Sequence, residues 1–346
     1  MPRTDLPMVR SHECIDYKRC MKKWFWRWRM GLVPKHRVIG ALDLGTWVHE
    51  ALALWYGPMQ HGTRHDVDLS ELFKGIAESA IAWAATDGAP QMQLDKAEEL
   101  RMLGQAMLAA YQTHYRNDGF EPIQAEIPLE FIISDNDGTE LATYKLKPDL
   151  LGRLPDGGVW LFEHKTAAAI RTEHLVIDDQ ARPYGAMAEL ELRRAGILKP
   201  GEVLKGIMYN YLRKGLPDER PTNDKGQALN KNGTISARQG APLFKRHPVL
   251  LSNKAKAATL RRKRVEVIEI TSMAAALRDG RLTPRWLQKT PHWSCPKTCD
   301  FFAMCALEEE GADISEMRRG MFVRQNPYLY DEEFPTTDEP PSFEMG

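Results

Sequence analysis

The sequence lacks any run of 18 or more apolar residues and contains only five cysteines in 346 residues. Without such a run there is no candidate for a membrane-spanning helix, and residues 1–10 contain no apolar segment of signal-peptide length. Five cysteines are also too few for the disulfide scaffold of a small secreted protein. We therefore expect a cytoplasmic protein that has no membrane partner.

The chain also lacks net charge, because 47 Lys and Arg residues balance 47 Asp and Glu residues. This balance hides an asymmetry, since residues 327–346 contain six acidic residues, four prolines and no Lys or Arg. A segment of this composition has too little apolar surface to form a core. We predict a flexible acidic tail at 327–346, and an excess of six positive charges over residues 1–326.

The rest of the chain has the composition of a folded globular protein, with 43% hydrophobic and 27% charged residues. Apolar residues at helical spacing predict helices, and short apolar runs bounded by Asp-Gly and Gly-Gly pairs predict strands. A first helix is expected within residues 1–45, and the other predicted helices are 44–55, 70–85, 93–116 and 183–195. The predicted strands lie within 124–131, 146–166 and 206–212.

Three basic segments are candidates for contact with nucleic acid. Residues 213–246 hold eight basic and three acidic residues without periodicity, which predicts a mobile basic loop. Lys18–Arg29 interleaves basic residues with Trp and Phe, which fits either DNA contact or an amphipathic helix with an aromatic core. The run Arg261–Arg264 is either a solvated helix face or a phosphate contact.

The densest chemical signal is a predicted hairpin, in which Asp149 precedes a Pro-Asp-Gly-Gly turn at 155–158 and Glu163 and Lys165 follow it. Side chains alternate along a strand, so Glu163 and Lys165 share a face, and the tight turn brings Asp149 near Glu163. Burying these charges is costly unless a cation or substrate compensates them. The carboxylates suit Mg²⁺ or Mn²⁺, and Lys165 would then act on the attacking water and on phosphate charge. Glu126, just ahead of the sheet, is a further candidate carboxylate.

The cysteines are clustered, because Cys295, Cys299 and Cys305 lie within eleven residues of one another. Three thiolates at this spacing can converge on a zinc ion or an iron–sulfur cluster, and the spacing does not distinguish the two. A closed site of either kind needs a fourth ligand from elsewhere in the chain.

Pro148-Asp149 and the triplet Glu163-His164-Lys165 resemble the motif of the PD-(D/E)XK nucleases. Within that superfamily, Gly45-Thr46-Trp47-Val48-His49 is similar to the helix of RecB-type nucleases whose histidine binds metal, and the segment from Gln180 to Tyr184 fits the QxxxY element. The resemblance implies the metal ligands His49, Asp149 and Glu163. It also implies the catalytic residues Asp149, Glu163, Lys165, Gln180 and Tyr184.

Ser11, Ile15, Tyr17 and Cys20 are similar to the beginning of the RecB/AddB-like iron–sulfur exonucleases, including those of CRISPR adaptation and of bacteriophages. In that branch one N-terminal cysteine joins three C-terminal cysteines around a [4Fe–4S] cluster. The resemblance therefore implies a cluster, with zinc as the alternative occupant, and leaves Cys14 as a buried thiol. Its ligands would be Cys20, Cys295, Cys299 and Cys305.

The expected fold is an α/β restriction-endonuclease-like core, with a mixed central sheet flanked by helices and a cluster region that joins the two ends of the chain. The expected division is an N-terminal helical segment (1–45), a nuclease core (46–290) with a helical insertion (60–120) and the basic loop (213–246), a cysteine segment (291–326), and the acidic tail (327–346).

The resemblance implies a metal-dependent DNA exonuclease that acts on DNA ends or single strands in recombination or repair, with a recombination or single-strand-binding protein as partner. The chain has no P-loop of the G-x-x-x-x-G-K-[ST] form, so we expect a nuclease without its own motor. Two alternatives remain open: a non-catalytic subunit that binds DNA ends, and an endonuclease on the same core.

Overall fold

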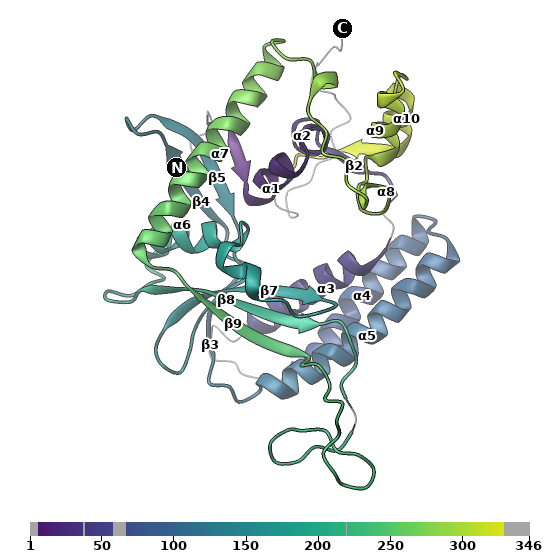
Figure 1. Ribbon diagram of the computed structural model, residues 1–346, viewed down its shortest axis with the longest axis vertical. Coiled ribbons are helices and arrows are strands. Elements are labelled where there is room, and N and C mark those ends of the chain that lie inside the picture. The colour runs from purple at the N-terminus through teal and green to yellow at the C-terminus, as the bar shows by residue number, and fades with distance from the viewer. Residues whose placement is uncertain (1–5, 37–38, 58–66, 219, 329–346) are drawn as a thin grey trace.

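The computed structural model describes residues 6–36, 39–57, 67–218 and 220–328 (Figure 1). The helices are α1 (Ser11–Arg19), α2 (Met21–Trp24), α3 (Ala41–Tyr56), α4 (Leu69–Thr86), α5 (Gln91–Tyr115), α6 (Ala181–Arg194), α7 (Asn253–Arg278), α8 (Cys295–Thr298), α9 (Phe302–Glu309) and α10 (Ser315–Met321). The strands are β1 (Met8–Arg10), β2 (Leu32–Pro34), β3 (Glu121–Ala125), β4 (Leu129–Ser134), β5 (Glu140–Leu146), β6 (Leu150–Arg153), β7 (Val159–Ala167), β8 (Leu204–Arg213), β9 (Phe244–Leu250) and β10 (Phe322–Arg324).

The central sheet has the strand order β3-β6-β7-β8-β9 over the described residues. Strands β7 and β8 run parallel, whereas the other neighbouring pairs are antiparallel. The α6 helix connects β7 to β8, as a parallel pair requires a crossover. The mixed central sheet flanked by helices, expected from the sequence, is therefore confirmed.

Alternation along β7 divides the interior into two cores. Trp160 and Phe162 pack with α3, α4 and α5 on one face of the sheet, whereas Leu161 packs with α6 on the other. Glu163 follows Leu161 by two residues, and so it projects to the α6 face. His164 follows Phe162 by two residues and projects to the α3 face. The site residues of one strand are thereby distributed over both layers.

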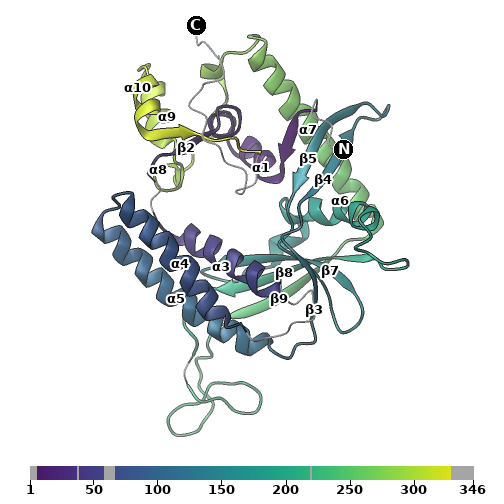
Figure 2. The ribbon, with the colours of Figure 1, turned by 180° about the vertical axis from the view of Figure 1, so that it is seen from behind.

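Helices α3, α4 and α5 lie side by side as one layer (Figures 1 and 2). The predicted helices at 44–55, 70–85 and 93–116 correspond to these three, with small shifts at the ends. Gly104 lies buried in α5 against the Phe73 ring of α4 and Leu44 of α3, and it lets the three helices approach closely.

The opposite layer contains α6, α7 and a three-stranded sheet of order β1-β5-β4. The sequence predicted neither α7 nor β9. Two lysines of α7, Lys256 and Lys263, are buried, so its inward face is not marked by apolar residues alone. In β9, Pro248 occupies the edge of the sheet, where a missing N–H is tolerated. Neither α7 nor β9 therefore shows the regular spacing of apolar residues from which a helix or a strand is predicted.

Segments from near both ends of the chain come together in a lobe (Figure 1), where β2 pairs antiparallel with β10. The aromatic residues of the predicted DNA-contact segment are core residues of this lobe, because Trp24, Trp26 and Trp28 are each at most 5% exposed. Trp26 contacts the Phe301 ring at 5.6 Å between centroids. The amphipathic alternative is thus the correct one for these side chains.

Two residues of the predicted acidic tail, Pro327 and Tyr328, contact the N-terminal segment. The Tyr328 hydroxyl donates to Glu13 Oε2 at 3.0 Å, and Arg10 donates to the Pro327 carbonyl at 2.9 Å. These two tail residues are therefore held against the N-terminal segment, whereas 329–346 lie outside the described residues.

The sequence predicted a loop over residues 213–246. The loop is shorter in the structure, because Arg213 is the last residue of β8 and Phe244 is the first residue of β9. Within it, two small antiparallel bridges join Thr222 to Ala228 and Leu229 to Ile235. Over the described part of the chain, no helix combines the length and apolar character needed to cross a membrane.

The close packing at Gly104 yields a stability prediction. In Gly104→Ala the added Cβ would overlap Phe73 and approach Leu44 Cδ1 to 2.8 Å. We expect this overlap to outweigh the gain in helix propensity and to lower the free energy of unfolding by about 1–2 kcal/mol. The control Gly75→Ala has no atom within 4 Å of its new Cβ, and should raise stability by about 0.5–1 kcal/mol in the same urea titration. Equal stability gains in both variants would contradict the tight packing.

Candidate active site

The predicted hairpin is formed by β6 and β7, with Leu150 opposite Phe162. Asp149, immediately before β6, therefore lies beside the Glu163–His164 end of β7. The backbone N–H of His164 donates to Asp149 Oδ2 at 2.7 Å. The structure thus brings together the two carboxylates that the sequence placed on facing strands.

Lys165 links this hairpin to the turn before α6. Its Nζ donates to Glu163 Oε1 and to Gln180 Oε1, each at 2.7 Å. The Glu163 side chain is 3% exposed and the Lys165 side chain 25%, so the ammonium lies between a buried carboxylate and solvent. Gln180, which the sequence predicted as a catalytic residue, therefore contacts Lys165 directly through its side-chain oxygen.

His49 approaches from α3, with Nδ1 3.4 Å from Asp149 Oδ1. Burial would lower the pKa of His49, but the charge of Asp149 outweighs it and raises the pKa to about 9. Burial likewise opposes ionisation of Asp149, yet His49 holds its pKa well below the usual range. The two side chains therefore form a charged pair at neutral pH.

The pKa of Glu163 is shifted in the opposite direction from that of Asp149. Burial, reinforced by the negative charge of Asp149, raises its pKa to about 7, although Lys165 acts in the other direction. Glu126 lies nearby, because the charges of Asp149 and His49 act on its pKa, which burial raises. Glu126 Oε2 also contacts Lys147 Nζ at 2.5 Å, so each of these carboxylates has a cationic partner in this structure.

The two remaining predicted residues lie at the start of α6. Gln180 is the N-cap of α6, and Pro183 falls in the first turn, where a missing N–H removes no helical hydrogen bond. Tyr184 is buried in the same hydrophobic core as Tyr144 of β5, between α6 and the three-stranded sheet.

A model of the PD-(D/E)XK nuclease superfamily matches residues 14–306. The chain belongs to this superfamily. Its members are in general metal-dependent nucleases, so the superfamily points to DNA as the substrate. The match spans every residue of the site described above.

Other comparisons add little to this placement. No curated protein matches the chain significantly. Among solved structures, the crystal structure of SSO0001 overlaps with 88% of each chain at 13% identity, but the TM-score is only 0.32. The superfamily match, and not this overlap, places the chain.

The donors at the site suit the divalent metal that the superfamily uses. Carboxylate oxygens and an imidazole nitrogen are ligands for Mg²⁺ and Mn²⁺. Among the described residues, however, no three His, Cys, Asp or Glu side chains converge as a metal site, because Asp149 faces His49 and Glu163 faces Lys165. Rotation of these side chains toward a shared ion would be required.

The four cysteines predicted as cluster ligands lie in the lobe that contains β2 and β10. Cys20 separates α1 from α2, Cys295 begins α8, Cys299 follows its last residue, and Cys305 lies in α9. The charges of Cys20 and Cys299 act on the pKa of Cys305, which burial raises. These thiols are neighbours, although in the described ranges they do not form a metal-binding geometry. Cys14 is fully buried, and burial raises its pKa to about 12.

A buried polar chain behind β7 was not predicted from the sequence. Asn210 Nδ2 donates to His164 Nδ1 at 2.9 Å and to the Tyr111 hydroxyl at 2.8 Å. The Tyr111 hydroxyl lies 2.9 Å from that of Tyr56. The sequence signal was Asn210 itself, a polar residue within an apolar strand.

His164 yields a prediction of pH dependence. Burial, aided by the charges of His49 and Arg246, lowers its pKa to about 3, whereas an unfolded histidine has a pKa of about 6.5. The unfolded chain therefore binds the proton first, and the stability due to neutral His164 is complete above about pH 6.5 and lost as the pH falls toward 3. At pH 5 this loss is about 2 kcal/mol.

Denaturant titrations at pH 7 and pH 5 measure this effect. His164→Asn should lose less stability between these pH values than the wild type, by about 2 kcal/mol. His36→Asn is the control, because the His36 side chain is 78% exposed, and should follow the wild type. An identical pH dependence in all three proteins would contradict a neutral His164.

Proposed function

We propose that this protein is a metal-dependent DNA exonuclease, which hydrolyses phosphodiester bonds at DNA ends or in single strands during recombination or repair. The observation that carries the proposal is the fork at Lys165, whose ammonium contacts both Glu163 and Gln180 at 2.7 Å beside Asp149. In a superfamily of nucleases, a lysine held in this way at paired carboxylates favours hydrolysis over DNA binding alone.

Asp149, Glu163 and His49 would hold Mg²⁺ or Mn²⁺, which supplies a Lewis acid and lowers the pKa of bound water. Lys165, fixed by Glu163 and Gln180, directs its ammonium toward the negative charge that develops on the phosphate. Asp149 is oriented by the His164 N–H on one oxygen, while its other oxygen faces His49, the further residue of the proposed metal site. The burial of Glu163 excludes water from one side of the site.

Two observations favour DNA ends or single strands. Helix α1 is attached to the site, because Ser11 Oγ donates to the Gln180 carbonyl at 3.3 Å. The lobe that contains β2 and β10 continues from this helix through α2, and we expect it to limit access of an intact duplex to Lys165. An endonuclease and a non-catalytic end-binding subunit remain the alternatives.

A nuclease assay distinguishes these functions. Linear and closed circular DNA, each single- and double-stranded, would be incubated with Mg²⁺ or Mn²⁺, with EDTA as the blank. We expect degradation of linear substrates and survival of closed circles. Cleavage of the circles would identify an endonuclease, and DNA binding without cleavage in either metal would favour the non-catalytic subunit.

Lys165→Ala tests the site directly. We expect the cleavage rate to fall at least about 10²–10³-fold, with DNA affinity nearly unchanged, because the lysine acts on transition-state charge. Glu163→Ala should have the same effect and also weaken metal binding. The control is Lys205→Ala, an exposed lysine at the other end of the neighbouring strand β8. Cleavage by Lys165→Ala near the wild-type rate would exclude this site.

We further propose that Cys20, Cys295, Cys299 and Cys305 bind a [4Fe–4S] cluster. The placement of all four cysteines in the lobe where β2 pairs with β10 supports this proposal. The lobe has other connections as well, because Lys22 Nζ contacts Glu308 Oε1 at 2.6 Å and β2 pairs with β10. A cluster would therefore reinforce a junction that the polypeptide already makes.

Metal analysis tests the cluster. Protein purified without oxygen should be brown, with about four iron and four sulfide per chain, and Cys20→Ala should lose colour and stability. Cys14→Ala is the control, since Cys14 is a buried thiol, and should keep its iron. About one zinc per chain without sulfide would exclude the iron–sulfur cluster.

A further inference from the structure

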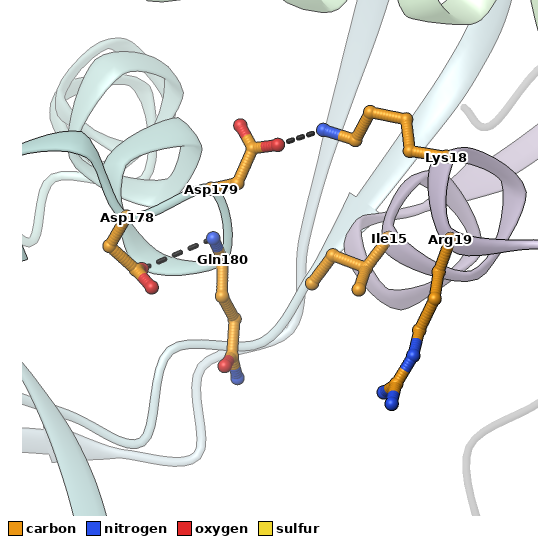
Figure 3. A pocket seen from close by; sticks show the side chains of 6 residues that line it. All are labelled: Ile15, Lys18, Arg19, Asp178, Asp179 and Gln180. Carbon is orange, nitrogen blue, oxygen red and sulfur yellow. Dashed lines mark hydrogen bonds and ion pairs between the residues drawn. The ribbon is translucent and has the colours of Figure 1, made fainter. Parts of the chain in front are cut away.

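A pocket of about 410 Å³ opens between α1 and the turn that precedes α6 (Figure 3). This α1 pocket adjoins the proposed active site through Gln180, whose side chain contacts Lys165. Its lining residues are Ile15, Lys18, Arg19, Asp178, Asp179 and Gln180.

The acidic residues of the α1 pocket already have partners within the protein. Asp178 Oδ2 caps α6 by accepting from the backbone N–H groups of Gln180 at 3.1 Å and Ala181 at 2.7 Å, and it also accepts from the Tyr209 hydroxyl. Asp179 pairs with Lys18 of α1 and lies 3.5 Å from Lys263 of α7. These contacts cap α6 and join the turn before it to α1 and α7.

Two donors in the pocket have no such partner. Gln180 Oε1 accepts from Lys165, so its Nε2 group faces away from the lysine with two hydrogens to donate. Arg19 is exposed, and among the described residues no acidic side chain pairs with it. Figure 3 shows the side chains of Gln180 and Arg19 extending toward the same side of the pocket.

One face of α1 continues this surface toward Lys165. His12, Ile15 and Arg19 are spaced by three and four residues, and so they lie on the same side of the helix. His12 is exposed, yet surrounding protein lowers its pKa, and the positive charge of Lys165 adds to this effect.

We propose that the α1 pocket holds the nucleotide next to the scissile phosphate of a single DNA strand. Ile15 offers an apolar surface to the base, whereas Arg19 and Gln180 Nε2 donate to the adjoining phosphate. The volume is that of a small-ligand site, and the pocket lies one side chain from Lys165. A base can enter it only when it is unpaired. This inference rests on the proposed nuclease function and adds a substrate contact to it.

Binding measured in EDTA tests the pocket without requiring cleavage. The probe is a fluorescently labelled single-stranded oligonucleotide, titrated over a range of salt concentrations. Arg19→Ala should bind about five- to tenfold more weakly, and the slope of log affinity against log salt should fall by about 0.7, as expected for one lost phosphate contact on a single strand. Arg194→Ala, an arginine that is 66% exposed on α6, is the control and should match the wild type.

A second variant tests the placement of the base. Ile15→Trp should fill the pocket and weaken binding of the normal oligonucleotide. An oligonucleotide with an abasic nucleotide next to the cleaved bond should bind the wild type more weakly, but lose little further affinity to Ile15→Trp. Because Ile15→Trp is less conservative than Arg19→Ala, thermal unfolding of both variants would be compared first, and the arginine variant remains decisive if the tryptophan variant does not fold.

The outcomes separate this inference from the nuclease function. If the wild type cleaves DNA while Arg19→Ala keeps its affinity and salt slope, the pocket is not a phosphate contact. If the wild type binds but does not cleave, and Arg19→Ala binds more weakly, the pocket contact holds and the nuclease proposal fails. Equal effects of Ile15→Trp on normal and abasic strands would overturn the base contact.

Discussion

The buried carboxylates at the end of the β6–β7 hairpin impose the constraint on which the rest of this structure depends. Each needs a compensating partner, because an unpaired buried charge is strongly destabilising. His49 of α3 pairs with Asp149, and Lys165 pairs with Glu163. Lys165 in turn binds Gln180 at the start of α6. The charges of one hairpin thereby fix the helices on both faces of the central sheet.

A second constraint acts on the ends of the chain. The π-helix at Phe25–Arg29 places its aromatic side chains in the lobe core, and Lys22, with only 1% of its side chain exposed, reaches Glu308. Breaking such a buried pair from one side leaves an uncompensated charge. The lobe therefore holds α1 in place, and α1 supplies the wall of the pocket beside Gln180 (Figure 3).

Much of the core could be predicted from the sequence because its signals are local. The β6–β7 hairpin, the α3–α5 layer and strand β8 all follow from apolar spacing and turn residues. The missed elements break those patterns. Buried lysines in α7 pair with Glu189 and Glu266, where a predicted helix would have apolar residues. The parallel partner of β5 is the three-residue strand β1, which is too short to show an alternation of apolar and polar residues.

The sequence by itself determined that Glu163 and Lys165 share a strand face and that Asp149 lies across from them, since the period of a strand and the length of a turn are local properties. Only the tertiary structure decided that the tryptophans near residue 26 are core and not a DNA-binding surface, and that Arg19 is exposed while Lys18 is paired. These outcomes depend on which distant segments pack against each residue. The local order of residue types along the chain does not specify which distant segments will pack together.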